Sequence, residues 1–431
     1  MKVSTWIGIF GCLMALAYLC NPDVARAQNH RNCAWPIEFS PEGFANFMIP
    51  ETFARDFLIP FDTQYDTMTI KGTYPNVRYF SFVVYRDKTP TDIVDGHGLY
   101  DAQIAPDPGS VNPFVKPGGS NGKYTVVISR TESSSGNTIG VQDDFVWVFL
   151  RMYVPSADRS LSGLSLIGGV PLPTIVLTKN GASQELSQCS PVNDLKDVTT
   201  YLQDMFKGID ALQGSEGTPS SDRLWFAPLI PPMRVMPNPD NKYIAIFPGD
   251  YQPGRIIVIH GKAPGTPDTY DGSPIWKPAR GFRTVDMRYW SLCNNDLALP
   301  FSVVNCTADL TTELQGGDYT IVISDDLLRP DWLRPNINWL PWGDKHYLKV
   351  LLFRNMLPAP DFPFSVQKAI DPGGCTFEFT LPNIPDRDVI DQQGPCAQQV
   401  MGEYYPVAVW CDKSTFIHGG WQACINGHSA H

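Results

Sequence analysis

Two six-residue stretches decide the predicted fold: Tyr124-Thr125-Val126-Val127-Ile128-Ser129 and Tyr319-Thr320-Ile321-Val322-Ile323-Ser324. Both are built from β-branched and aromatic residues and contain no strong helix former, so each favours a strand. They lie in different halves of the chain and are nearly identical. The sequence therefore predicts an internal repeat of one β-rich unit.

Three further blocks occur in both halves in the same order, which strengthens the prediction of a repeat. We expect Gly72 and Gly261 to end strands where the chain turns, because a proline follows each within a few residues. In the R-Y-aromatic-S block, period-two alternation places the tyrosine and the second aromatic on opposite faces of a strand. The matched blocks are Ile70-Lys71-Gly72 with Ile259-His260-Gly261, Arg78-Tyr79-Phe80-Ser81 with Arg288-Tyr289-Trp290-Ser291, and Arg151 to Pro155 with Arg354 to Pro358.

The composition supports an all-β fold. The 431 residues include 39 Pro and 35 Gly, 12% are aromatic, and only 18% are charged, which suits many short strands with tight turns. We predict two tandem antiparallel β-sandwich domains, jelly-roll-like, joined by an amphipathic helix. The predicted parts are a signal peptide (1–27), a first sandwich (28–190), a linker helix (191–222), a second sandwich (223–374) and a cysteine-rich C-terminal tail (375–431).

The linker is predicted to be helical because its apolar residues recur at spacings of three and four, from Leu195 to Leu212. Asn193 or Asp194 can cap its start. Its polar face carries four aspartates and two lysines, whereas a helix lying on a membrane favours a basic face. We therefore expect it to pack against the sandwiches.

The amino terminus has the pattern of a secretory signal. Lys2 precedes an apolar run from Trp6 to Cys20, and Ala25-Arg26-Ala27 is a small-x-small cleavage site. Cleavage after Ala27 would send the chain to the periplasm or outside the cell. A lipoprotein signal at Cys20 is the alternative, which the large residues Tyr18 and Leu19 disfavour. No later segment approaches the roughly 20 apolar residues of a membrane span.

The formal net charge of −11 restricts the class of partner. Nucleic-acid binding requires a basic surface, and so does adhesion to an anionic membrane. We expect neither kind of partner.

Eight cysteines remain after the signal, and an even number in an exported chain predicts disulfides. The chain contains no C-x-x-C and no zinc-finger spacing, which argues against a metal site. Local bridges are expected where two cysteines enclose twelve residues, and the first domain would be closed by a long one. Eight cysteines allow 105 connectivities. The set we choose among them is Cys293–Cys306, Cys411–Cys424, Cys375–Cys396 and Cys33–Cys189.

The second half resembles an uncharacterised bacterial β-domain family of unknown function, found in exported two-domain proteins. The resemblance rests on Arg288-Tyr289-Trp290-Ser291-Leu292, Asn338-Trp339-Leu340-Pro341 and the strand end Arg354 to Pro358. The first half carries that strand end in purer form, as Arg151-Met152-Tyr153-Val154-Pro155. The resemblance implies a jelly-roll-like sandwich in two tandem copies and names no activity. Arg354-Asn355-Met356 lacks the family's tyrosine, and the tail from Cys375 is unmatched.

Candidates for chemistry are few, and no motif shows whether the chain is an enzyme. His97 lies between glycines, which would let a ligand approach, and Asp95, Asp101 and Asp107 share its long loop. Such acids could serve glycoside hydrolysis if two of them met across a cleft. Asp268 and Asp271 lie in a loop of the second half, from Gly265 to Asp286, that the first half lacks. Solvated loop acids are the simpler interpretation for all of them.

A metal is not required by any motif. Asp386-x-Asp388-x-x-Asp391 resembles an oxygen-ligand loop and would suit structural calcium, but it lacks the glycine and final glutamate of an EF-hand.

Aromatic side chains give the strongest functional hint. Trp332, Trp339 and Trp342 cluster among prolines, and Trp276 lies in the inserted loop. Exposed tryptophans can stack on sugar rings, and the alternative is that these loops bury them over the sandwich ends. We therefore expect a carbohydrate- or protein-binding scaffold of the cell envelope, and as the alternative a secreted hydrolase acting on polysaccharide through loop carboxylates.

Overall fold

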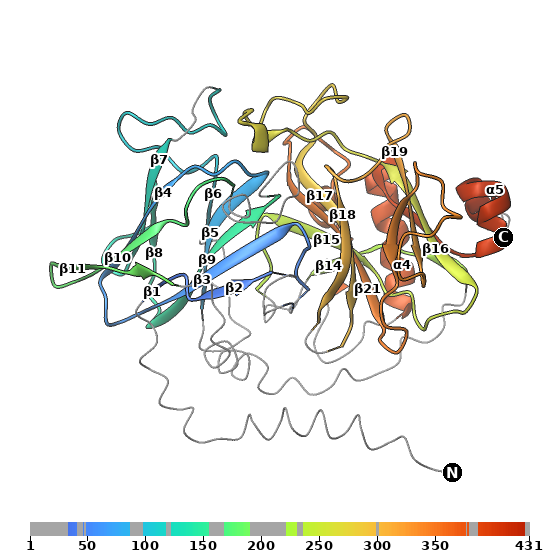
Figure 1. Ribbon diagram of the computed structural model, residues 1–431, viewed down its shortest axis with the longest axis horizontal. Coiled ribbons are helices and arrows are strands. Elements are labelled where there is room, and N and C mark those ends of the chain that lie inside the picture. The colour runs from blue at the N-terminus through green and yellow to red at the C-terminus, as the bar shows by residue number, and fades with distance from the viewer. Residues whose placement is uncertain are drawn as a thin grey trace, which may run out of the picture.

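The computed structural model describes residues 33–40, 46, 49–86, 98–117, 122–154, 168–189, 221–230, 236–298, 301–375, 377–378 and 387–426. The described chain is mostly β-sheet with a few helices. Figure 1 shows residues 33–189, the amino-terminal half, in blue to green beside residues 221–426, the carboxy-terminal half, in yellow-green to red. The predicted signal peptide, and the predicted linker helix up to residue 220, lie outside the described residues.

The amino-terminal half holds two five-stranded sheets. One has the order β11 (Ala182–Glu185), β10 (Thr174–Lys179), β4 (Thr67–Thr73), β7 (Lys123–Ser129), β8 (Thr138–Gly140). The other has the order β2 (Ile37–Phe39), β3 (Ala54–Asp62), β9 (Phe145–Tyr153), β5 (Tyr79–Arg86), β6 (Gly98–Tyr100). A single buried cluster takes side chains from both sheets, for example Ile59 and Phe80 from the second and Ile70 and Val126 from the first.

The carboxy-terminal half repeats this arrangement. Its first sheet has the order β13 (Arg223–Leu224), β23 (Val407–Asp412), β16 (Arg255–Lys262), β19 (Asp318–Ser324), β20 (Asn338–Pro341). Its second has the order β18 (Val303–Ala308), β17 (Met287–Asp296), β21 (Lys349–Pro358), β15 (Asn241–Ile246), β14 (Ala227–Ile230), β22 (Phe377–Glu378). In the first sheet of each half, the final strand pairs in parallel with its neighbour, β8 with β7 and β20 with β19. All other neighbouring strands of these two sheets are antiparallel.

The chain after Cys375, which we expected to form a separate tail, is built into the carboxy-terminal half. Its strand β23 pairs with β16 from Arg255–Asp412 to His260–Val407 and so occupies the place that β10 occupies beside β4. Helices α3 (Val366–Ile370), α4 (Arg387–Met401) and α5 (Lys413–Asn426) and the short 3₁₀ turns Thr269–Asp271 and Gly402–Tyr404 complete this half. The sequence pattern had not indicated these helices.

Four disulfides staple the fold, and they are the predicted pairs. Cys33–Cys189 closes the amino-terminal half, where β1 (Cys33–Ala34) runs parallel to β12 (Ser187–Gln188). Cys293–Cys306 joins the facing strands β17 and β18. Cys375–Cys396 and Cys411–Cys424 attach α4 and α5 to the carboxy-terminal half.

The two repeat glycines have a different role from the one we expected. Each strand continues one residue past its glycine, so turning is not the reason for glycine there. A Cβ on Gly72 would lie 2.4 Å from the hydroxyl oxygen of Tyr124, and one on Gly261 would lie 2.7 Å from that of Tyr319. Both tyrosines are buried, so each glycine makes room for the ring of the neighbouring strand's tyrosine.

We predict that Gly72→Ala destabilises the protein by about 1–3 kcal/mol, because the new methyl overlaps a ring that cannot leave the core. Urea unfolding would measure the loss. Gly98→Ala, on the edge strand β6, is the control, because its Cβ would lie 3.4 Å from the nearest atom. Equal stability of the Gly72→Ala variant and the wild type would contradict the packing role.

Candidate functional site

The halves meet through two buried ion pairs that mirror each other. Arg288 of β17 donates to both carboxylate oxygens of Asp101, at 3.0 and 2.8 Å. Arg78, just before β5, lies 3.1 Å from the carboxylate of Asp309. These four side chains are between 0 and 4% exposed. We call the contact between the halves around these two pairs the seam.

Equivalent residues of the two halves have exchanged partners across the seam. Arg78 and Arg288 begin the two R-Y-aromatic-S blocks, and we call them the repeat arginines. Each pairs with an aspartate of the other half. The two aspartates correspond as well, because the amide of Asp101 donates to the Phe80 carbonyl and that of Asp309 to the Trp290 carbonyl. This reciprocity has the form of a two-fold symmetric dimer interface within one chain.

Two short arms extend the reciprocity. The first arm, residues 46 and 49–53, hydrogen-bonds to the carboxy-terminal half, where the Ile49 amide donates to the Phe301 carbonyl at 2.8 Å and Arg354 donates to the Ile49 carbonyl at 3.1 Å. The second arm, residues 236–240, lies on the amino-terminal half, where Arg151 donates to the Met236 carbonyl at 2.6 Å.

The two arms also match in conformation. Ile49 and Met236 each precede a proline and each have a positive φ, 56° and 47°, which is rare outside glycine. A cluster of tyrosines, with Tyr79 and Tyr153 from one half and Tyr289 from the other, fills the seam between the arms. As the alternation predicted, Tyr79 faces the seam while Phe80 enters the core of its own half.

The inserted loop of the carboxy-terminal half, Gly265 to Asp286, is also fastened across the seam. The hydroxyl of Thr269 lies 2.9 Å from the Val77 carbonyl oxygen and 2.8 Å from that of Arg78. The amide of Ile275 donates to the Phe114 carbonyl at 2.8 Å. The loop therefore belongs structurally to both halves.

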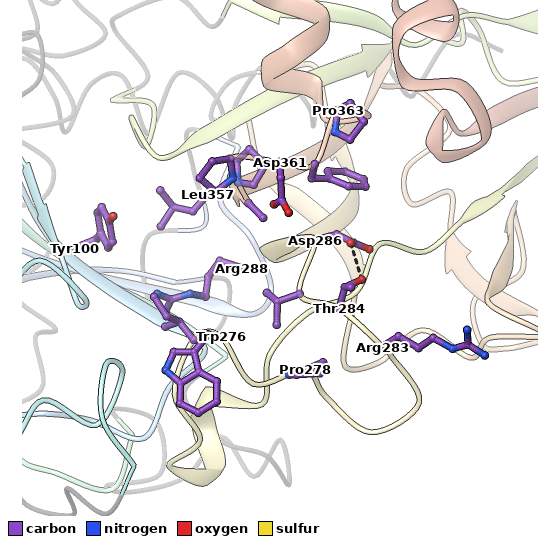
Figure 2. Close-up of a pocket in the computed structure, with 16 residues that line it drawn as sticks. Tyr100, Trp276, Pro278, Arg283, Thr284, Asp286, Arg288, Leu357, Asp361 and Pro363 are labelled. Carbon is purple, nitrogen blue, oxygen red and sulfur yellow. Dashed lines mark hydrogen bonds between the residues drawn. The ribbon is translucent and has the colours of Figure 1, made fainter.

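A pocket of about 790 Å³ opens where this loop meets the seam. Its walls are Tyr100 of β6, Ile275, Trp276, Pro278 and residues 283–286 of the inserted loop, Arg288, and residues 357–363 at the end of β21 and just after it. Figure 2 shows Trp276, Asp286 and Asp361 around it. The walls are mostly aromatic, aliphatic and proline side chains.

The polar groups of the pocket differ in how firmly hydrogen bonds hold them in place. Asp286 already accepts hydrogen bonds from the Gly265 amide at 2.7 Å and the Thr284 hydroxyl at 2.9 Å, which fixes its orientation. Asp361 and Arg283 are exposed. Burial, and then the charges of Asp240 and Asp101, raise the pKa of Tyr100, so its hydroxyl is a neutral donor at physiological pH. The pocket thus combines one aromatic wall with several hydrogen-bonding groups.

Of the four predicted ligand-binding tryptophans, Trp276 lines this pocket and is 63% exposed. Trp342 is 1% exposed and packs against Trp410 and Tyr251, so the prediction that it contacts a ligand is corrected to a core role. Trp332 and Trp339 are half-buried beside α5, and the indole of Trp339 donates to the Ser324 hydroxyl at 2.9 Å.

The predicted loop acids whose side chains the structure describes, Asp101, Asp107 and Asp268, do not line the pocket. Asp101 is fully buried and paired with Arg288, so it is a structural residue; burial raises its pKa, and Arg288 opposes that shift. Asp107 accepts a hydrogen bond from Thr125, and Asp268 one from Tyr270. Asp95 and His97 lie outside the described residues, as does the side chain of Asp271.

For the predicted calcium loop, Asp388 and Asp391 lie in the first turns of α4, while Asp386 lies outside the described residues. In the part of the chain that the structure describes, no group of three or more His, Cys, Asp or Glu is placed to hold a metal ion.

Sequence reasoning missed Asp286, Asp361, Arg283 and Tyr100. One signal was present: the proline-rich run from Pro358 to Pro363 follows the last repeat block directly and has no counterpart after Pro155. A segment that one half has and the matched half lacks is a candidate for a function of its own.

Within the described residues, no helix has both the length and the apolar character needed to cross a membrane. No protein-family model matches the chain, and no curated protein matches it in sequence. Solved structures do resemble it. The first is an uncharacterised protein from Burkholderia cenocepacia, with 13% identity and a TM-score of 0.50 over 83% of this chain and 88% of that one.

The chain shares its fold with that Burkholderia protein. A protein from Vibrio parahaemolyticus aligns at 12% identity over 72% of this chain and 85% of that one, with a TM-score of 0.37. At such identities the first likeness concerns the fold alone. The Burkholderia protein is itself uncharacterised, which is consistent with a bacterial family of unknown function.

We predict that Asp101→Asn destabilises the protein by about 3–5 kcal/mol, because it leaves the guanidinium of Arg288 buried without a counter-charge. Urea unfolding of the variant would measure this. Asp107→Asn, in the same loop but half-exposed, should change stability by less than about 0.5 kcal/mol. A stable Asp101→Asn variant would show that the seam does not depend on this pair.

Proposed function

We propose that the protein is an exported binding protein of the cell envelope that holds a carbohydrate in the pocket at the seam. The observation that carries the proposal is Trp276, a tryptophan left 63% exposed beside a pocket of about 790 Å³. A flat indole face is complementary to the C–H face of a pyranose ring, and the surrounding acids, Thr284 and Arg283 can exchange hydrogen bonds with hydroxyls.

The frame around the pocket supports the same proposal. We propose that each half is a jelly-roll-like sandwich and that the halves are copies of one duplicated unit, since their strand orders and seam partners correspond. The pocket uses residues from both, so the seam must be rigid for the pocket to keep its shape. Preformed pockets lose little entropy when a ligand binds.

Export is part of the proposal. Four disulfides fit a protein that folds outside the cytoplasm, in the periplasm or beyond the cell. Cleavage of a signal peptide after Ala27 would deliver it there. An envelope protein is the other partner that a surface tryptophan could serve.

We predict that Trp276→Ala weakens carbohydrate binding at least tenfold, about 1.4 kcal/mol, because the ring that stacks on the sugar is removed. A glycan array would identify the ligand, and calorimetry would give the dissociation constants. The melting temperature should not change, since the side chain is mostly exposed.

The matched control is Tyr347→Ala, an aromatic residue 46% exposed just before β21, at the end of that strand opposite to the pocket. It should bind like the wild type. Failure of the wild type to bind any glycan would reject the carbohydrate proposal, and binding that survives in Trp276→Ala would reject this pocket.

A polysaccharide hydrolase is the second candidate, because Asp286 and Asp361 line one pocket and glycoside hydrolysis uses two carboxylates. The two hydrogen bonds that Asp286 accepts from its own loop favour a positioning role. Release of reducing ends from a bound oligosaccharide by the wild type, lost in Asp361→Asn, would establish the hydrolase. Binding without product would establish the binding protein.

A further inference from the structure

We propose that Glu51 makes the seam a proton-controlled latch: the halves are held most tightly in mildly acidic medium and loosen as the pH rises toward neutrality. The inference concerns the contact between the halves and holds whatever ligand the pocket takes. It rests first on where the first arm places Glu51.

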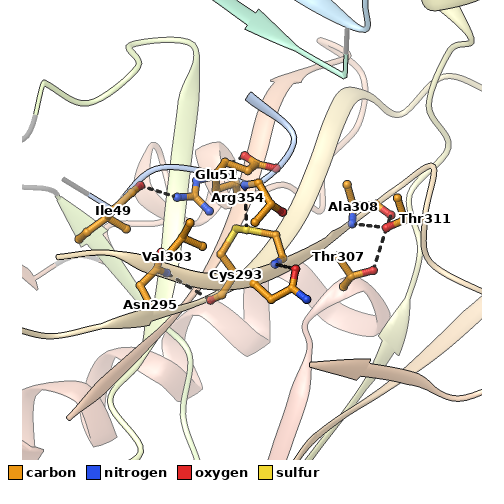
Figure 3. Close-up of a disulfide and its surroundings, with 12 residues drawn as sticks. Ile49, Glu51, Cys293, Asn295, Val303, Thr307, Ala308, Thr311 and Arg354 are labelled. Atoms are coloured by element: carbon orange, nitrogen blue, oxygen red, sulfur yellow. Dashed lines mark hydrogen bonds and ion pairs between the residues drawn. A yellow bond between two sulfur atoms is a disulfide. The ribbon is translucent and has the colours of Figure 1, made fainter. Parts of the chain in front are cut away.

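The first arm carries the Glu51 side chain across the seam into the carboxy-terminal half. The residue is 2% exposed. Its carboxylate accepts a hydrogen bond from the hydroxyl of Tyr289, on β17. The next residue, Thr52, directs its amide at the Sγ of Cys306, 3.4 Å away, in the disulfide that joins β17 to β18. Figure 3 shows Glu51 beside Arg354 and this disulfide.

The opposite charge near Glu51 is poorly placed to hold it ionised. The Nε of Arg354 lies 3.7 Å from Oε2 of Glu51, beyond hydrogen-bond distance, and Arg354 donates instead to the Ile49 carbonyl. Oε2 of Glu51 and Nη1 of Arg354 are both buried without a hydrogen-bond partner. At this distance the attraction of Arg354 does not offset the free energy needed to remove the carboxylate from water.

The second arm carries an amide at the matching position. Counting from Ile49 and Met236, Glu51 corresponds to Asn238. The hydroxyl of Tyr79, the counterpart of Tyr289, donates to the carboxylate of Asp240 at 2.5 Å and lies 3.4 Å from the amide oxygen of Asn238. Of the two matched positions, only Glu51 can bind and release a proton.

The electrostatics of the surroundings agree. Burial raises the pKa of Glu51 to about 7, while the charge of Arg354 and the nearby Ser291 hydroxyl oppose the shift and the charges of Asp309 and Asp56 add to it. Glu51 also interacts with Tyr153 of β9 and Tyr243 of β15, whose own pKa values burial raises. Burial likewise raises the pKa of four other carboxyls at or near the seam, Asp56, Asp101, Asp240 and Asp309.

The sign of the effect follows from this direction. A carboxyl with a raised pKa binds its proton more tightly in the closed seam than in water, so closing takes up a proton between about pH 4.5 and 7. Rising pH removes that proton and favours opening. A shift of this size changes the opening equilibrium by roughly a hundredfold between pH 5 and pH 8.

Hydrogen exchange of the first arm would test the latch without any ligand. In the wild type, protection of the Ile49 and Thr52 amides, corrected for the intrinsic pH dependence of exchange, should fall roughly a hundredfold from pH 5 to pH 8. Glu51→Gln mimics the protonated acid, so it should lose most of this dependence and exceed the wild type at pH 8. Glu132→Gln, at an exposed site, should behave like the wild type.

Tyr289→Phe provides a second variant that keeps the acid. It removes a hydrogen bond that stabilises the carboxylate, so the midpoint of the pH dependence should move to higher pH. The latch is overturned if wild-type protection is the same at pH 5 and pH 8, or if Glu51→Gln is less protected than the wild type at both. The second result would show that the charge itself closes the seam.

Discussion

A guanidinium buried between two sheets must meet an opposite charge, and in this protein each half lacks the one that its repeat arginine needs. Arg78 finds Asp309 and Arg288 finds Asp101, each across the seam. Desolvating four charged groups is costly, so the arrangement is stable only with the halves joined. The pocket also exists only while the halves are joined, because Arg288 lines it and Tyr100, another lining residue, immediately precedes Asp101.

The residues that interact across the seam correspond between the two halves, whereas the segments added around the seam do not. Both arms turn through a positive φ before a proline, and both repeat arginines pair with an aspartate of the other half. The carboxy-terminal half alone adds the inserted loop and the proline-rich run after β21, and these form most of the pocket wall. The first arm alone carries an acid where its counterpart carries an amide. The features that distinguish the two halves therefore gather where the halves touch.

The carboxy-terminal tail illustrates how the two halves differ in construction. In the amino-terminal half the strand beside β4 is β10, whereas beside β16 it is β23, which arrives only after α4. The disulfides Cys375–Cys396 and Cys411–Cys424 hold the elements around this late strand. The carboxy-terminal half is thus completed by the last part of the chain, and its cysteines serve the sheet.

The sequence by itself determined the strands of the matched blocks and the presence of disulfides. The Y-T-V-V-I-S and Y-T-I-V-I-S stretches became β7 and β19 because strand preference is local, and the two local disulfides formed between cysteines that enclose twelve residues. Only the tertiary structure decided that Trp342 is core, that Asp101 is half of an ion pair, and that Trp276 stands beside a pocket. The neighbours of these side chains come from distant parts of the chain, so burial and charge pairing depend on how the two halves dock.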